Sequence, residues 1–225
     1  MSARSGAGAR LTDISVPSPA DPPGSVVLVL HGGPEHGTRR CHWWMPQVLR
    51  CRMLARAVAR RWQRRRVGPV AVYLLQHAWT GWDGDGRDAL ADLAWAMRLI
   101  DQRHPGVPLA LLGHSMGART AVRAADAVGV VGVVGLAPWL RAGDPVSPLV
   151  GRSLVVVQGT RDRELPAATT TVFLERVVAA GVPLRRESVR GGGHAMLFRM
   201  GTWSRRATMG LMDIVDVART TDRAG

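Results

Sequence analysis

The sequence contains no lysine, so all 30 of its basic residues are arginine. Against 17 acidic residues, these arginines give a formal net charge of +13 at pH 7. Clustered arginines can neutralise the phosphates of a nucleic acid, but no nucleic-acid-binding motif accompanies the charge. The abundance of Ala, Gly, Val and Arg is instead typical of a GC-rich genome. We therefore do not expect a nucleic-acid partner.

Cysteine is scarce, and long apolar runs are absent. The only two cysteines are Cys41 and Cys51; a disulfide and two free thiols both fit their spacing, and free thiols are our expectation. No spacing of Cys or His residues is typical of a metal site. The apolar runs at 25–30 and 128–140 are too short or too interrupted by glycine to span a bilayer. The N-terminus lacks the apolar segment of a secretory signal, so we expect a cytoplasmic protein without a transmembrane segment or metal.

Two regions of different composition follow one another along the chain. Residues 1–24 are rich in Ser, Ala, Gly and Pro, which predicts a loose segment with one edge strand near 11–16. From residue 25 to 225, short apolar runs alternate with helical patterns, which predicts a single α/β domain with a mostly parallel central sheet and helices on both faces. Strands are expected at 26–31, 70–76, 109–113, 130–136, 154–158 and 184–189. Helices are expected at 44–65, 86–104, 116–127, 166–180 and 195–217.

The segment between the fourth and fifth of these strands is short. It covers residues 137–153, which is too few for a helical cap domain. The sequence therefore predicts an open site without a large cap.

A nucleophile-elbow pattern, G-x-S-x-G, occupies residues 113–117. It follows an apolar strand and precedes a helix, which is the structural context that this motif requires. Gly113 and Gly117 would leave room for a strained turn that exposes the hydroxyl of Ser115. The pattern predicts Ser115 as a catalytic nucleophile.

A serine hydroxyl needs a base to remove its proton, and that base needs an acid to orient it. His194 follows three glycines directly after the last expected strand, so a flexible loop can bring its imidazole over the sheet. Asp162 follows a strand and a glycine turn, which suits the orienting acid. Glu164 and Asp144 are alternatives for that acid. The order Ser115, Asp162, His194 along the chain then completes a triad.

Two backbone N–H groups are predicted to bind the oxyanion of an acyl-transfer intermediate. One is that of Met116, directly after the nucleophile. The other lies in the glycine turn after the first strong strand, where Pro34 has no N–H and Gly33 is therefore the expected donor.

These motifs resemble those of the α/β-hydrolase superfamily, over residues 25–217. They are HGG at 31–33, GHSMG at 113–117, GTRD at 159–162 and GGGH at 191–194. The resemblance implies hydrolysis of a small-molecule acyl ester without a cofactor, in the manner of small cap-less esterases, lysophospholipase-like and dienelactone-hydrolase-like enzymes. A thioesterase of a biosynthetic pathway and a non-catalytic ligand-binding protein are the alternatives. The N-terminus departs from the family because it offers one strand before Val26 where the full fold has two, which predicts an abbreviated sheet.

Several other side chains are candidates for substrate binding. His114, Trp79, Trp82 and Trp139 lie in or beside the loops at the expected catalytic edge, where tryptophans suit either a substrate pocket or helix packing. The arginines of the run 60–66 suit either a solvated helix end or a face that docks an anionic substrate or carrier.

Overall fold

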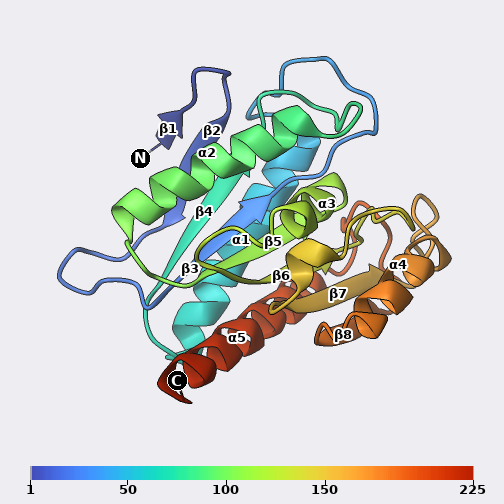
Figure 1. The fold of residues 1–225 in the computed structure, drawn as a ribbon. Coiled ribbons are helices and arrows are strands. Elements are labelled where there is room, and N and C mark those ends of the chain that lie inside the picture. Colours follow the sequence, from blue (N-terminus) through green and yellow to red (C-terminus); the bar gives the residue numbers. More distant parts are fainter. Residues whose placement is uncertain (1, 225) are drawn as a thin grey trace.

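The computed structural model describes residues 2–224, and the side chains of residues 2–220. One sheet of eight strands runs through it (Figure 1). The strands are β1 (Ser2–Arg4), β2 (Arg10–Ser15), β3 (Ser25–Leu30), β4 (Val70–Gln76), β5 (Leu109–His114), β6 (Val130–Leu136), β7 (Ser153–Gly159) and β8 (Leu184–Val189). The helices are α1 (Pro46–Arg65), α2 (Arg87–Arg103), α3 (Met116–Arg123), α4 (Ala168–Ala179) and α5 (Met200–Ala224), with a 3-10 turn at Ser147–Leu149.

The strand order is β1-β2-β4-β3-β5-β6-β7-β8. Strands β3 to β8 are parallel, and β1 and β2 join antiparallel beside β4. The chain passes from β3 to β4 on one side and then returns to β5 on the other side of β3. The order therefore reverses at β3 and β5, and in open α/β sheets the crevice at such a reversal is where ligands bind.

Two helical layers cover the sheet, as Figure 1 shows. Apolar residues of α2, α3 and α4 pack on one face, and those of α1 and α5 pack on the other. Consecutive residues of β3 point to opposite layers, so Leu28 joins the first cluster while Val27 and Val29 join the second. This two-sided burial explains why β3 to β7 are largely continuous apolar runs. The edge strand β8, LRRESV, is largely polar.

The predicted strands and helices from residue 25 onward are present, most with small shifts at their ends; the last helix, expected at 195–217, instead covers Met200–Ala224. The helix expected at 116–127 is shorter and ends at Arg123. The expectation of an abbreviated sheet was wrong, because residues 2–15 supply two strands rather than one. The strand missed is β1, which has three residues and pairs only with β2. A strand this short has no hydrophobic period that a sequence could show.

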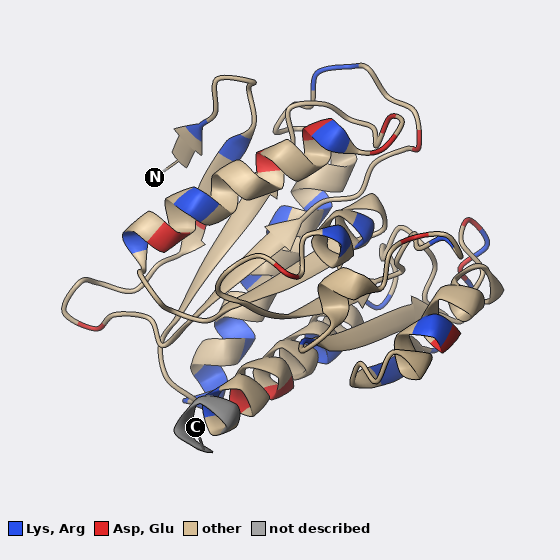
Figure 2. Ribbon diagram, in the orientation of Figure 1, with Lys and Arg blue, Asp and Glu red and all other residues tan. Residues whose placement is uncertain are grey.

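Charged residues occur on all layers of the fold. Figure 2 shows basic residues on each layer and acidic residues beside them on α2 and α5.

Cys41 and Cys51 are buried free thiols, as expected from the sequence. Burial raises the pKa of each thiol to about 12, so both are protonated at pH 7. Within residues 2–224, no helix is long and apolar enough to cross a membrane.

Candidate active site

The turn between β5 and α3 holds Ser115 in a strained conformation. Its φ is 52° and its ψ is −117°, and a positive φ is uncommon for a non-glycine residue. A Cβ on Gly113 would stand 2.3 Å from the backbone nitrogen of Ala118, and one on Gly117 would stand 2.6 Å from the carbonyl oxygen of Leu30. Both positions therefore require glycine, and together they fix a sharp turn with the serine at its tip.

Three side chains that the sequence predicts as a triad lie in one hydrogen-bonded chain. His194 Nε2 is 3.0 Å from Ser115 Oγ, and His194 Nδ1 is 3.0 Å from Asp162 Oδ2. The His194 side chain is 10% exposed and that of Asp162 is fully buried. This arrangement lets the imidazole take a proton from the serine on one nitrogen while the carboxylate orients it through the other.

Asp162 is held by three donors besides the histidine. Its Oδ1 accepts the backbone N–H groups of Glu164 at 3.1 Å and Leu165 at 2.9 Å, and its Oδ2 accepts the side-chain amide of Gln158 at 2.9 Å. These bonds fix the carboxylate as the turn after β7 closes around it. Gln158 is a residue that sequence reasoning missed, because a glutamine at a strand end carries no pattern that marks it as a partner of the acid.

The two alternative acids lie elsewhere. Glu164 Oε2 is 3.9 Å from His194 Nε2, which is the nitrogen that faces the serine, and the Glu164 side chain is 70% exposed. Asp144 instead forms an ion pair with Arg119, at 2.6 Å. Neither carboxylate contacts Nδ1 of His194, so Asp162 is the one placed to orient the ring.

The glycine turn after β3 lies against the nucleophile. A Cβ on Gly33 would stand 2.0 Å from the carbonyl oxygen of Thr80 and 3.0 Å from Met116 Sδ, and a Cβ on Gly32 would stand 3.1 Å from Ser115 Cβ. Met116 is the first residue of α3, and the first N–H groups of a helix have no partner within that helix. The two predicted oxyanion donors, Gly33 and Met116, are thus neighbours across this turn.

Two buried histidines position these loops. His31 Nδ1 lies 2.7 Å from the Gly32 carbonyl and its Nε2 lies 3.1 Å from the backbone nitrogen of His77, which makes Nδ1 the donor and Nε2 the acceptor. His114 Nε2 donates to the carbonyl of His194 at 2.9 Å. Burial lowers the pKa of both His31 and His114 to about 3, so both are neutral at pH 7 and donate from one nitrogen each. His114, predicted as a substrate contact, is 3% exposed and faces the loop of His194.

The three tryptophans predicted at this edge differ in exposure. Trp82 is 2% exposed, so it offers no surface to a substrate. Trp79 is half-buried, packs against the core and lies 4.1 Å beneath the guanidinium of Arg40. Trp139 is half-buried, and its backbone N–H donates to the carbonyl of Ser115 at 3.3 Å. Of the three, Trp139 is the one placed beside the nucleophile.

A buried arginine joins two of these tryptophans. The guanidinium of Arg119 lies 4.5 Å from the ring centre of Trp82 and 4.6 Å from that of Trp139. It also donates twice to one carboxylate oxygen of Asp144. Cation–π contacts and a paired carboxylate together compensate for burying the charge. Trp82 and Trp139 therefore serve to fix the loops around α3.

This cluster yields a stability prediction. Asp144→Ala leaves the Arg119 charge buried without its carboxylate and removes the acceptor of the Arg141 backbone N–H, so we expect the free energy of unfolding to fall by about 3 kcal/mol. The control is Asp126→Ala on an exposed aspartate, which should change it by less than about 0.5 kcal/mol. Urea denaturation measures both; equal effects of the two substitutions would contradict the role of the pair.

The arginines of the 60–66 run lie near the amino ends of the parallel strands, whereas the candidate site lies at their carboxyl ends. Helix α1 ends at Arg65, shortly before β4 begins at Val70, whereas Ser115 follows the carboxyl end of β5. A substrate held at Ser115 would therefore not touch Arg64 or Arg65.

Among the described residues, no group of three or more His, Cys, Asp or Glu side chains is arranged to hold a metal ion.

Comparisons with known proteins agree with this fold. The family model for serine aminopeptidase S33 matches residues 80–168, which is less than half of the chain but includes Ser115 and Asp162. An α/β serine hydrolase homologue from Coxiella burnetii superposes with a TM-score of 0.67 at 17% identity, over 90% of this chain and 91% of that one. An α/β serine hydrolase without a lid from Xanthomonas campestris gives 0.66 at 19% identity, over 95% and 93%. These solved structures share the fold of this chain, which is that of the α/β hydrolases.

A thermophilic esterase from the planctomycete Thermogutta terrifontis, Est2, shares the α/β-hydrolase fold at a TM-score of 0.62 and 17% identity, over 92% of this chain and 86% of that one. No curated protein matches the sequence. Identities this low establish the fold and leave the substrate of this protein to be argued from its own residues.

Proposed function

We propose that this protein is a serine hydrolase that cleaves carboxylic esters through Ser115, His194 and Asp162. The observation that carries the proposal is the continuous hydrogen-bonded chain from Ser115 Oγ through His194 to Asp162, with both links at 3.0 Å. The strained backbone of Ser115 adds support, because such strain persists where the surrounding structure enforces it, often at active sites.

The proposed reaction has two halves. His194 Nε2 takes the proton of Ser115 while Oγ bonds to the ester carbonyl carbon, which leaves the carbonyl oxygen negatively charged. The intermediate collapses, the bond to the alcohol oxygen breaks, and His194 returns the proton to the departing alcohol. Water then attacks the acyl-enzyme by the same route, which releases a carboxylic acid and restores Ser115.

The backbone N–H groups of Gly33 and Met116 are the proposed donors to the charged oxygen. Donors fixed before the reaction stabilise the intermediate without reorganising. The bond from His31 to the Gly32 carbonyl and the close approach of Gly33 to Thr80 hold the first donor in place. The helix start holds the second.

The same residues would also cleave a thioester. We propose the ester because one of the structural neighbours is named an esterase, and we keep the thioester as a second substrate to be assayed with the same protein.

Labelling with a fluorophosphonate tests the proposal directly. An activated serine displaces fluoride from phosphorus, and the adduct is retained, so the intact mass should rise by one adduct on the natural chain. The Ser115→Ala variant should remain unlabelled under the same conditions. An adduct on both proteins would place the reactive group elsewhere, and an adduct on neither would contradict an activated Ser115.

A further inference from the structure

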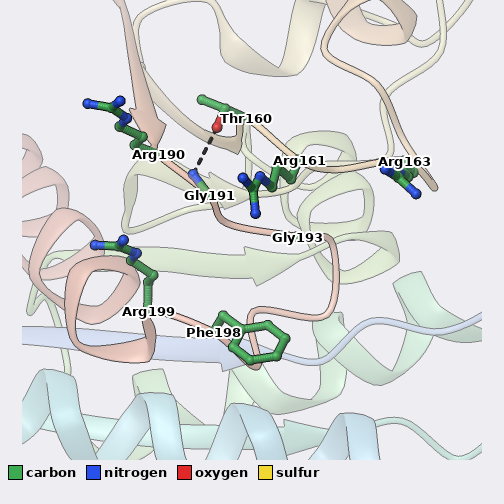
Figure 3. Close-up of a pocket in the computed structure, with 8 residues that line it drawn as sticks. All are labelled: Thr160, Arg161, Arg163, Arg190, Gly191, Gly193, Phe198 and Arg199. Carbon is green, nitrogen blue, oxygen red and sulfur yellow. Dashed lines mark hydrogen bonds between the residues drawn. The ribbon is translucent and has the colours of Figure 1, made fainter.

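A hollow of about 760 Å³ lies beside the proposed triad. Its charged lining comes from four arginines, and Phe198 supplies an apolar wall. The arginines are Arg161, Arg163, Arg190 and Arg199. Figure 3 shows Arg190 and Arg199 on one side, Arg163 on the other and Arg161 between them.

The positive charge of this hollow is not neutralised by the protein. All four arginine side chains are exposed, and within residues 2–220 none of the four forms an ion pair with an acidic side chain. Two acids lie in the same loop: Glu164, whose carboxylate lies 3.9 Å from His194, and Asp162, which is buried and bonded to His194. Four cations against these two anions leave the hollow with a net positive charge that favours an anionic ligand.

The hollow is built on the loops that carry the triad. Arg161 and Arg163 flank Asp162 in the loop after β7, and Gly193, in the loop after β8, directly precedes His194. The Arg161 backbone N–H donates to the carbonyl of Gly192 at 2.9 Å. The backbone of the hollow is therefore fixed relative to the proposed base.

A second bond joins the two loops. The Gly191 N–H donates to Thr160 Oγ1 at 2.9 Å, which Figure 3 marks. A Cβ on Gly159 would stand 2.3 Å from the carbonyl oxygen of Gly192, so the loops approach as closely as backbone allows. Arg199 has a φ of 63°, and a left-handed arginine persists only where its surroundings enforce that conformation.

The position of the hollow points to one part of the substrate. In the proposed reaction, His194 returns a proton to the departing alcohol, so the leaving group lies on the histidine side of Ser115. The hollow lies on that side, because it borders the residues before His194 and on both sides of Asp162. We infer that the hollow binds a phosphate carried by the leaving group of an acyl ester, an inference that rests on the proposed function.

Phosphate suits this lining better than a single carboxylate does. A phosphate monoester carries close to two negative charges and three acceptor oxygens at pH 7, and guanidinium groups bind phosphate with paired hydrogen bonds. Phe198 is 76% exposed and can cover the carbon chain that joins the phosphate to the ester. A second arginine-lined hollow, at Arg61, Arg64, Arg65 and Arg205, measures about 120 Å³ and lies along α1 and α5, away from the loops of the triad.

The first test compares two esters that differ only in the phosphate: 1-butanoyl-glycerol and 1-butanoyl-glycerol 3-phosphate. We expect kcat/KM to be about tenfold higher for the phosphorylated ester. The double substitution Arg190→Gln with Arg199→Gln should lower the ratio of the two kcat/KM values about tenfold. High salt should also lower it, because the arginines are exposed.

The matched control removes the same charge from another place. Arg64→Gln with Arg65→Gln should keep the ratio within about twofold. A ratio near one in the natural protein would overturn the inference. An equal fall in both double variants would overturn it too, because it would assign the preference to net charge alone.

A binding experiment separates this inference from the proposed function. Glycerol 3-phosphate is titrated by calorimetry into the Ser115→Ala protein, with glycerol as the comparison. We expect binding of glycerol 3-phosphate only, with a Kd that rises about tenfold when Arg190 and Arg199 are also replaced. Absence of binding, with the neutral ester still hydrolysed by the natural protein, would overturn the phosphate site alone. Binding with neither ester hydrolysed would overturn the proposed function alone.

Discussion

Ser115→Ala is expected to lower kcat for a short p-nitrophenyl ester by about a millionfold, the scale found when the nucleophile of a serine triad is removed. The reason is that His194 and the oxyanion donors then have no nucleophile to act with. The thermal midpoint should stay within about 3 °C, because Ser115 makes one side-chain hydrogen bond, to His194, and alanine leaves the surrounding glycine contacts unchanged.

A serine outside the site provides the comparison. Ser18 is exposed in the loop after β2, so Ser18→Ala should retain full activity and full stability. Retained esterase activity in the Ser115 variant would rule out this nucleophile. A large drop in its thermal midpoint would mean that lost activity reports unfolding instead, and the variant's far-ultraviolet circular dichroism would then differ from that of the natural protein.

Asp162→Asn is expected to lower kcat by about ten-thousandfold. An asparagine can present its amide N–H₂ to Nδ1 of His194, which favours the tautomer whose proton lies on Nε2. That tautomer cannot accept the proton of Ser115. The backbone N–H groups of Glu164 and Leu165, which donate to Oδ1, would keep the amide oxygen at that position and turn the amide nitrogen toward the ring. The side-chain amide of Gln158, which donates to Oδ2, would then lose its acceptor.

Glu164→Gln is the matched control, two residues away with the same loss of charge. Because Glu164 is largely exposed and lies on the Nε2 side of His194, we expect kcat to change by less than about fivefold. Steady-state kinetics on one neutral ester decides between the two acids: a large loss for Glu164→Gln with a small one for Asp162→Asn would reverse their roles.

The residues of the candidate site could be predicted because each carries a local signal. The glycines around Ser115 mark a turn that only glycine permits, and three glycines before His194 mark a loop that can reach across the sheet. Asp162 is harder, since Glu164 lies in the same turn. Only the distance from each carboxylate to Nδ1 of His194 shows which acid can orient the ring. That distance depends on how two loops from different strands meet.

Other features depend on contacts distant in sequence, so no local pattern could reveal them. Arg119 lies against both Trp82 and Trp139, and the three residues come from three separate segments of the chain. The pattern of tryptophans at the catalytic edge fits a pocket and a packing role equally well until their exposure is known. The arginine-lined hollow likewise combines the loops after β7 and β8, whereas in the sequence the conspicuous basic run is the one at 60–66.

The hydrogen bonds between the loops after β7 and β8 also bear on how this protein could be redesigned. Thr160 and Arg161 are bonded to Gly191 and Gly192, and Gly159 leaves no gap between them. A graft that replaces one loop would break these bonds and displace Asp162 relative to His194. Exchange of the proposed leaving-group specificity with a related scaffold would therefore require residues 159–165 and 190–199 to be transplanted together, as one module.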